Sequence, residues 1–239
     1  MPTSTLRHEP RTASDPDARR RILIVDDHPV FRFGLGQLLG SEDDLEVCGE
    51  AIDGSSALDE VQRLAPDLVI VDISLPGVGG IEVIKRLKAL YPDLRVLVVS
   101  MHDEALFAER SLRAGAGGYV MKDAPPDVLL GALRRVLRGE MAVSEEIANR
   151  MLHILVRGGE RGRESSLAYL SDRELEIYEL VGRSMRTRDI AEALHISVKT
   201  VEAHQASIKS KLGVSSTTTL RRDAAIWIAS GGGRGGAPP

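Results

Sequence analysis

Residues 22–28 read Ile-Leu-Ile-Val-Asp-Asp-His, four consecutive aliphatic residues followed at once by two acids. Such a run is typical of a strand buried on both faces of a parallel sheet. Four further apolar runs follow, and the segments between them carry apolar residues at helical spacing. The predicted strands are residues 22–25, 45–51, 68–71, 95–100 and 118–121, and the predicted helices are 30–39, 54–64, 80–90, 104–114 and 126–138. This alternation predicts one doubly wound α/β domain over residues 21–140, with helices on both faces of a five-stranded parallel sheet.

The chain changes character after residue 140. Residues 141–168 are predicted to be a partly helical linker, with one helix at 144–156 followed by a stretch rich in Gly, Arg, Glu and Ser. A compact all-helical pattern at 169–230 predicts a second, smaller domain. The ends, 1–20 and 231–239, are biased enough in composition to be predicted as disordered tails.

Length and composition exclude several classes of protein. A chain of 239 residues suits two modest domains. Its single cysteine, Cys48, excludes an internal disulfide framework and a cysteine-based zinc site. No apolar run is long enough to span a bilayer, and the amino terminus lacks the apolar core of a signal peptide. We therefore expect a cytoplasmic protein without a membrane partner.

The charge differs between the two predicted domains. Residues 21–140 hold 13 Lys and Arg against 20 Asp and Glu, whereas residues 169–230 hold nine against eight. The excess of acidic residues in the larger domain argues against a protein that coats nucleic acid nonspecifically. It is compatible with a small module that binds DNA through groove contacts.

Polar side chains follow four of the predicted strands, at the sheet edge where doubly wound folds bind ligands. They are Asp26 and Asp27, Asp72, Ser100 and Lys122. Three converging carboxylates would repel one another unless a cation joined them, and Mg²⁺ prefers oxygen ligands. A carboxylate beside the metal could attack a phosphoryl group, whose oxygens the lysine and the serine could then bind. Each acid alone could equally be a loop residue or a helix cap, so the prediction rests on the combination.

The first domain resembles a response-regulator receiver domain, with its flavodoxin-like fold, at residues 22–28, 72–77, 99–100 and 114–123. The resemblance implies that Asp72 is the phosphoacceptor and that a sensor histidine kinase is the donor. It also implies that Asp27, Asp72 and the carbonyl of Ser74 bind Mg²⁺ directly, while Asp26 acts through water. Lys122 would bind the phosphate.

The resemblance also covers residues that respond to the phosphate. Ser100 and Tyr119 match the family's switch pair, in which the hydroxyl moves toward the phosphate and the aromatic ring turns inward. Ser74 and His102 occupy positions that tune the lifetime of the phosphoryl group. A histidine at a loop entry is common, so we predict that His102 is an ordinary surface residue and leave it out of the core site.

The second domain begins with a strong helix-start signal. Ser171 and Glu174 fit a capping box, and the helix is expected to run to about residue 182. Further helices are predicted at 188–194 and 198–212, the last capped by Ser197. Helical periodicity places Val198, Val201, Ile208 and Leu212 on its inward stripe and leaves a small, polar outward face. That face suits a DNA major groove, although a plain three-helix packing unit would show the same periodicity.

The motif at residues 170–174, 189–204 and 211–214 resembles the LuxR-type helix-turn-helix. With the receiver, the chain from 21 to 230 resembles a NarL/FixJ-type response regulator, which is a transcription factor and not an enzyme. The resemblance implies DNA contacts by Lys199, Thr200, Glu202, Ala203, Ala206 and Lys209, with phosphate contacts also from Lys211. A last helix at about 220–229 would support a homodimer, in which Trp227 is either a core aromatic or a dimer contact. Ser184 stands where the family usually has glycine.

The resulting hypothesis is a regulator whose phosphorylation on Asp72 controls dimerisation and binding to promoter DNA. One alternative is a constitutive or ligand-gated LuxR-type DNA-binding protein whose receiver is never phosphorylated. A second is a phosphohydrolase that uses Asp72. Phosphatases of the haloacid-dehalogenase type carry a second Asp two residues on, where this chain has Ser74, which disfavours that reading.

Overall fold

The computed structural model describes residues 19–156 and 166–229. The chain divides into two compact units, Met1–Ala148 and Asn149–Pro239, and each is considered by itself. The predicted tails lie outside the described residues, apart from Arg19 and Arg20, and so does most of the predicted Gly- and Arg-rich stretch. Arg20 is not part of a tail, because it is the first residue of a strand. Within the described ranges no helix is both long and apolar enough to cross a bilayer.

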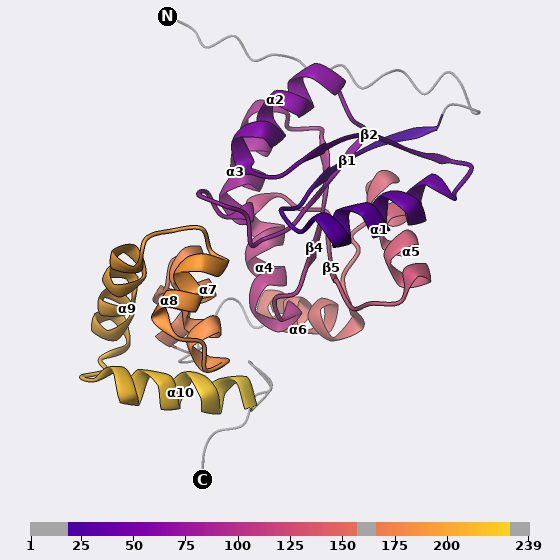
Figure 1. Cartoon of the computed structure of the whole chain (residues 1–239). Helices are drawn as coiled ribbons and strands as arrows, with labels where there is room; N and C mark the ends of the chain where they lie inside the picture. Colours follow the sequence, from indigo (N-terminus) through magenta and orange to yellow (C-terminus); the bar gives the residue numbers. More distant parts are fainter. Residues whose placement is uncertain (1–18, 157–165, 230–239) are drawn as a thin grey trace, which may run out of the picture. The chain divides into compact units, whose positions relative to one another are not determined.

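The first unit is built on a five-stranded sheet in which every pair of neighbours is parallel. Its strands are β1 (Arg20–Val25), β2 (Leu45–Ala51), β3 (Leu68–Val71), β4 (Arg95–Ser100) and β5 (Gly118–Met121). Their order is β2-β1-β3-β4-β5 (Figure 1). This is the flavodoxin-like order, and it confirms the predicted fold class.

Helices cover both faces of this sheet (Figure 1). On one face lie α1 (Pro29–Gly40) and α5 (Pro126–Leu137), and on the other lie α2 (Gly54–Leu64), α3 (Gly80–Leu90) and α4 (Glu104–Ala114). All four residues of β3 are buried, as are the last four of β1, which explains why these strands read as unbroken aliphatic runs. Because all neighbouring strands are parallel, their carboxyl ends lie at one edge of the sheet.

The segment after α5 adds a short extension to the sheet, which the sequence analysis did not predict. Ala142, which is buried, forms a parallel bridge with Gly118 at the β5 edge. The amide of Tyr119 donates to the carbonyl of Ala142 at 2.8 Å, and the amide of Ala142 donates to the carbonyl of Gly117 at 2.9 Å. Helix α6 (Glu145–Val156) follows.

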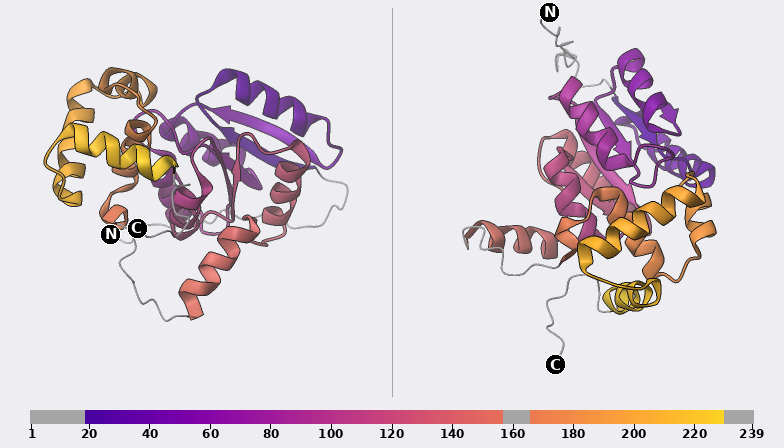
Figure 2. Two further views of the ribbon diagram at one scale, coloured as in Figure 1. Left: turned by 90° about the horizontal axis from the view of Figure 1, so that it is seen from below. Right: turned by 90° about the vertical axis from the view of Figure 1, so that its left-hand side faces the viewer.

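Between residues 166 and 229, the second unit contains a short 3₁₀ turn, η1 (Ser166–Tyr169), and four helices. These are α7 (Asp172–Gly182), α8 (Thr187–Ala193), α9 (Val198–Leu212) and α10 (Thr217–Ala229). Figure 2 shows this helical unit from two further directions, with α10 in yellow. The predicted capping box is present, because the Ser171 amide donates to the Glu174 carboxylate at 2.7 Å and the Glu174 amide donates to the Ser171 hydroxyl at 3.3 Å. A helical domain with an α8-turn-α9 arrangement is therefore confirmed.

Two details of this unit bear on the sequence analysis. Trp227 packs on Tyr178, with ring centroids 5.7 Å apart, so it contributes to the packing of α10 on α7. Ser184 has a φ of 63°, in the left-handed region. That conformation favours glycine, which accounts for the residue usual at this position in the family the sequence resembles.

Candidate functional site

Asp72 lies at the centre of a polar cluster at the carboxyl ends of the strands. It follows β3 directly and is 2% exposed. One of its carboxylate oxygens accepts a hydrogen bond from the Ser100 hydroxyl at 2.7 Å, and the other contacts the Lys122 ammonium at 2.7 Å. The backbone amide of Ser74 lies 3.4 Å from the first of these oxygens. The structure thus brings together four residues that the sequence placed on three different strand ends and the loops after them.

Lys122 bridges two acids. Its ammonium lies 2.6 Å from Asp26 and 2.7 Å from Asp72, and 4.5 Å from the centre of the Phe31 ring. Burial, together with repulsion from Asp72, raises the pKa of Asp26, and the hydrogen bond from Lys122 only partly offsets this. The cluster contains more carboxylates than its one lysine can neutralise.

The residues fit a divalent cation. Ligand atoms of Asp26, Asp27, His28 and Asp72 all lie within 4.8 Å of one another. Two ligands on opposite sides of Mg²⁺ are separated by about 4.2 Å, so the carboxylates have nearly the spacing of one coordination shell. Asp27 and His28 are the solvent-facing members, with side chains 12% and 59% exposed.

His28 is a neighbour of the cluster that the sequence analysis did not assign. Its Nδ1 lies 2.7 Å from an Asp27 oxygen and 3.3 Å from an Asp26 oxygen. Its position directly after the two acids was a signal that could have placed it there. Phe31, which covers Lys122 from α1, gave no such signal, because it reads as an ordinary apolar helix residue.

One member of the predicted switch pair is in contact with Asp72. The Ser100 hydroxyl donates to the Asp72 carboxylate at 2.7 Å, whereas the Tyr119 ring is buried and its hydroxyl donates to the carbonyl of His102 at 2.8 Å. The hydroxyl orientation and the inward ring match the arrangement that the resemblance associates with a phosphorylated receiver. The two residues are connected through the loop that follows β4.

His102 is not the surface residue that we expected. It is 5% exposed, its ring packs on Phe107 with centroids 4.6 Å apart, and its Nε2 lies 2.7 Å from the Ser74 hydroxyl. The expectation was wrong because the loop after β4 folds its second residue inward, against α4. His102 and Ser74 therefore form a hydrogen-bonded pair next to the acidic cluster.

The residues predicted to contact DNA lie together on α9. Ser197 caps this helix, because its hydroxyl accepts the Thr200 amide at 3.1 Å. The predicted contact residues other than Lys209 are exposed, and Lys209 is half-buried. The members of this face are Lys199, Thr200, Glu202, Ala203, Ala206 and Lys209.

The inward stripe of α9 differs from the predicted one at its first residue. Val201 and Ile208 are fully buried and Leu212 is half-buried, but Val198 is 42% exposed. Gln205 is buried instead, at 6% exposure. Val198 lies at the edge of the stripe, at the first position of α9.

Lys211, which the sequence analysis assigned to DNA phosphates, is held within the domain. Its ammonium contacts the Glu174 carboxylate at 2.6 Å, and the Ser207 hydroxyl donates to the same carboxylate at 2.6 Å. Burial opposes the charge, but hydrogen bonds from Lys211, Ser207 and Ser171 together lower the pKa of Glu174 to about 2. This cluster around the buried Glu174 ties α9 to the start of α7, and its members lie too far apart in sequence for a pattern to reveal it.

The depressed pKa of Glu174 predicts an acid-sensitive domain. An unperturbed glutamate holds its proton below about pH 4.3, so the unfolded chain binds more protons than the folded one between there and the native pKa of about 2. The stability contributed by Glu174 is present above that window and is lost as the pH falls through it. Urea unfolding followed by the emission of Trp227, the single tryptophan, should show this loss in the wild type and a flatter profile in Glu174→Gln.

The exposed Glu192 of α8 provides the control. Glu192→Gln should keep the wild-type acid profile. A Glu174→Gln profile that overlays the wild type would contradict the assignment.

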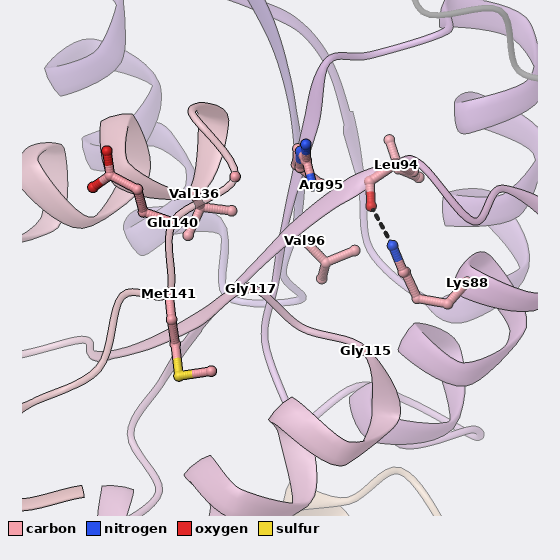
Figure 3. A pocket seen from close by; sticks show the side chains of 10 residues that line it. Lys88, Leu94, Arg95, Val96, Gly115, Gly117, Val136, Glu140 and Met141 are labelled. Atoms are coloured by element: carbon pink, nitrogen blue, oxygen red, sulfur yellow. Dashed lines mark hydrogen bonds between the residues drawn. The ribbon is translucent and has the colours of Figure 1, made fainter. Parts of the chain in front are cut away.

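A pocket lies at the amino ends of β4 and β5, away from this cluster (Figure 3). Its lining includes Arg95 and Val96, whereas Ser100 ends the same strand on the far side. The Lys88 ammonium donates to the carbonyl of Leu94 at 3.0 Å, as the dashed line in Figure 3 marks. None of the predicted site residues lines this pocket.

Two protein families match the two units. The receiver domain of response regulators matches residues 22–134, and the LuxR family of bacterial regulatory proteins matches residues 168–224. The chain belongs to the NarL/FixJ-type response regulators. This response regulator is therefore a two-component, DNA-binding regulator of transcription, as the sequence analysis predicted.

Similar proteins span most of the response regulator. The oxygen regulatory protein NreC of Staphylococcus carnosus is 36% identical over 204 residues, which cover 84% of this chain and 94% of NreC. The transcriptional activator protein ExaE of Pseudomonas putida is 41% identical over 199 residues, which cover 83% and 92%. RcsB of Salmonella enterica serovar Typhimurium, solved bound to the promoter rprA in the presence of the phosphomimetic BeF3-, is 27% identical with a TM-score of 0.58, covering 87% of this chain and 98% of RcsB.

Proposed function

We propose that this response regulator is phosphorylated on Asp72 by a sensor histidine kinase and that phosphorylation controls its dimerisation and its binding to promoter DNA. The observation that supports this most directly is the cluster around Asp72, in which Ser100 and Lys122 each contact one of its carboxylate oxygens. The domain boundaries 21–140 and 169–230 and the assigned site residues are part of the proposal.

The transfer needs a nucleophile and groups that accept the incoming charge. A carboxylate oxygen of Asp72 forms the new bond to phosphorus while the bond from phosphorus to the donor's imidazole nitrogen breaks. The electron pair of that bond leaves on the nitrogen, which then takes up a proton. Lys122 and the Ser100 hydroxyl are placed to bind the phosphoryl oxygens, because each already contacts the carboxylate that would carry them.

Asp27, Asp72 and the Ser74 carbonyl would hold Mg²⁺, with Asp26 acting through water. When bound, the ion would neutralise charge on the phosphoryl oxygens and on the acids. The chain's own contribution is to hold three carboxylates within reach of one ion and to place two of them next to a buried lysine.

Exposure to a small phosphodonor tests this function. In the presence of Mg²⁺, the full chain should gain the mass of one phosphoryl group, and the label should map to Asp72. If the chain gains no mass but still binds DNA sequence-specifically, the alternative of a constitutive or ligand-gated DNA-binding protein is correct. Steady release of phosphate from a phosphomonoester would instead indicate a phosphohydrolase.

The DNA-binding half of the proposal predicts a salt-dependent affinity. If Lys199 contacts a DNA phosphate, Lys199→Gln should reduce the slope of log affinity against log salt by about 0.9. Fluorescence anisotropy with a duplex selected by the wild-type chain from a random library measures this slope. Lys85→Gln, which removes an exposed lysine from α3, should leave the slope unchanged, and salt-insensitive binding by the wild type would contradict groove and phosphate contacts.

A further inference from the structure

Val198 is an apolar side chain in an unusual place. It is 42% exposed at the first position of α9, whose inward packing depends on Val201 and Ile208 instead. All residues of α9 are described, and Val198 is the only large apolar one among them that is exposed. A large part of its isopropyl group is therefore open to a partner on the helix surface.

The start of α9 is held firmly, so this group has a defined position. The Ser197 hydroxyl accepts the Thr200 amide at 3.1 Å and lies 2.8 Å from the Thr200 hydroxyl. Val198 is branched at Cβ, which restricts its rotation about χ1 in a helix. A fixed apolar group at a capped helix end loses little entropy when a partner covers it.

The neighbouring surface indicates what the partner is. Glu202 follows Val198 by four residues, so the two side chains lie on the same side of α9, and both are exposed. In helix-turn-helix proteins the N-terminal residues of the second helix contact base edges in the major groove. The rest of this face of α9 carries short side chains and Lys199, so DNA can approach it closely.

We infer that Val198 contacts the 5-methyl group of a thymine in the operator and thereby helps to determine sequence preference. This inference rests on the proposed function, because it requires α9 to enter the major groove. The chemistry is selective: the thymine methyl is the apolar group on the major-groove edges of the bases, and an isopropyl group neither donates nor accepts a hydrogen bond.

The test removes the methyl group from the DNA and the isopropyl group from the protein. A duplex selected from a random library by the full wild-type chain is prepared with each thymidine replaced in turn by deoxyuridine. At one position in a half-site, the wild type should bind the deoxyuridine duplex about fourfold more weakly, the equivalent of about 0.8 kcal/mol for one buried methyl group. Val198→Ala should bind both duplexes equally well.

Two further variants complete the design. Val198→Thr keeps the branch and one methyl group and should retain part of the preference. Tyr169→Ala removes another exposed apolar side chain, 74% exposed and outside α9, and should retain the whole preference. Circular dichroism spectra that match the wild type would show that the variants are folded.

The possible outcomes distinguish a failure of this inference from a failure of the proposed DNA-binding function. If the wild type selects no duplex sequence, the proposed DNA-binding function fails and the inference with it. If it selects a sequence, but no thymidine position shows a loss that depends on Val198, the function stands and the assignment of Val198 is overturned.

Discussion

Replacing Asp72 by Asn is expected to abolish phosphorylation of the chain. An amide lacks the nucleophilic charge of a carboxylate, yet it has nearly the same shape and can still accept the hydrogen bond from Ser100. Removing one charge from the cluster also relieves repulsion with Asp26, whose pKa Asp72 helps to raise. We therefore expect an unchanged fold and a complete loss of phosphoryl incorporation. Intact mass after treatment with a small phosphodonor and Mg²⁺ measures this.

A matched carboxylate provides the control. Asp123 follows Lys122 directly but is exposed, and Asp123→Asn should be phosphorylated like the wild type. DNA affinity measured in the same samples should increase on phosphorylation of the wild type and of Asp123→Asn only. Wild-type incorporation in Asp72→Asn would show that another residue is the acceptor.

Replacing Gly80 by Ala is expected to have the largest effect on stability. Helix α3 begins at Gly80, and a Cβ added there would lie 2.0 Å from the carbonyl oxygen of Asp72 and 2.8 Å from the Cα of Ile73. Both obstacles are backbone atoms, so the main chain at Asp72 and Ile73 must move. We expect a loss of about 3 kcal/mol in the free energy of unfolding, at the upper end of overpacking effects, together with slower phosphorylation.

The control for Gly80 is a glycine that has room for a side chain. Gly131 lies within α5, and a Cβ there meets nothing within 4 Å. Gly131→Ala should stabilise the chain by about 0.5–1 kcal/mol, because alanine is the better helix former. Urea unfolding followed by circular dichroism measures both variants. Equal effects of the two substitutions would show that the close approach at Gly80 is not a constraint.

Most of the receiver fold could be predicted because its strands are buried on both faces. The aliphatic runs that end at Val25 and Val71 have no polar interruption, and each is followed at once by the acids that occupy the sheet edge. Once the strands are parallel, their ends must meet, so the grouping of Asp72 with Lys122 followed from topology. His28 could have been assigned from its position directly after the two acids, but Phe31 could not, because its contact with Lys122 depends on where α1 starts.

The errors share a physical cause. His102 and Val198 both lie at the ends of regular elements, where periodicity no longer determines which way a side chain points. His102 turns inward because the loop after β4 folds over Ser74, whereas Val198 is exposed at the first position of α9. Contacts between distant segments, such as Lys211 with Glu174, leave no local pattern.

The pairing of Ala142 with β5 sets where this receiver could be cut and grafted onto another output domain. A junction directly after α5 would remove Ala142, leaving the Tyr119 amide and the Gly117 carbonyl without their partners on an open sheet edge. Such a chimera would expose a ready template for intermolecular strand pairing. A fusion point beyond Ile147, which is buried, would keep the bridge from Ala142 to Gly118, so hybrid regulators built there should stay monodisperse where shorter ones aggregate.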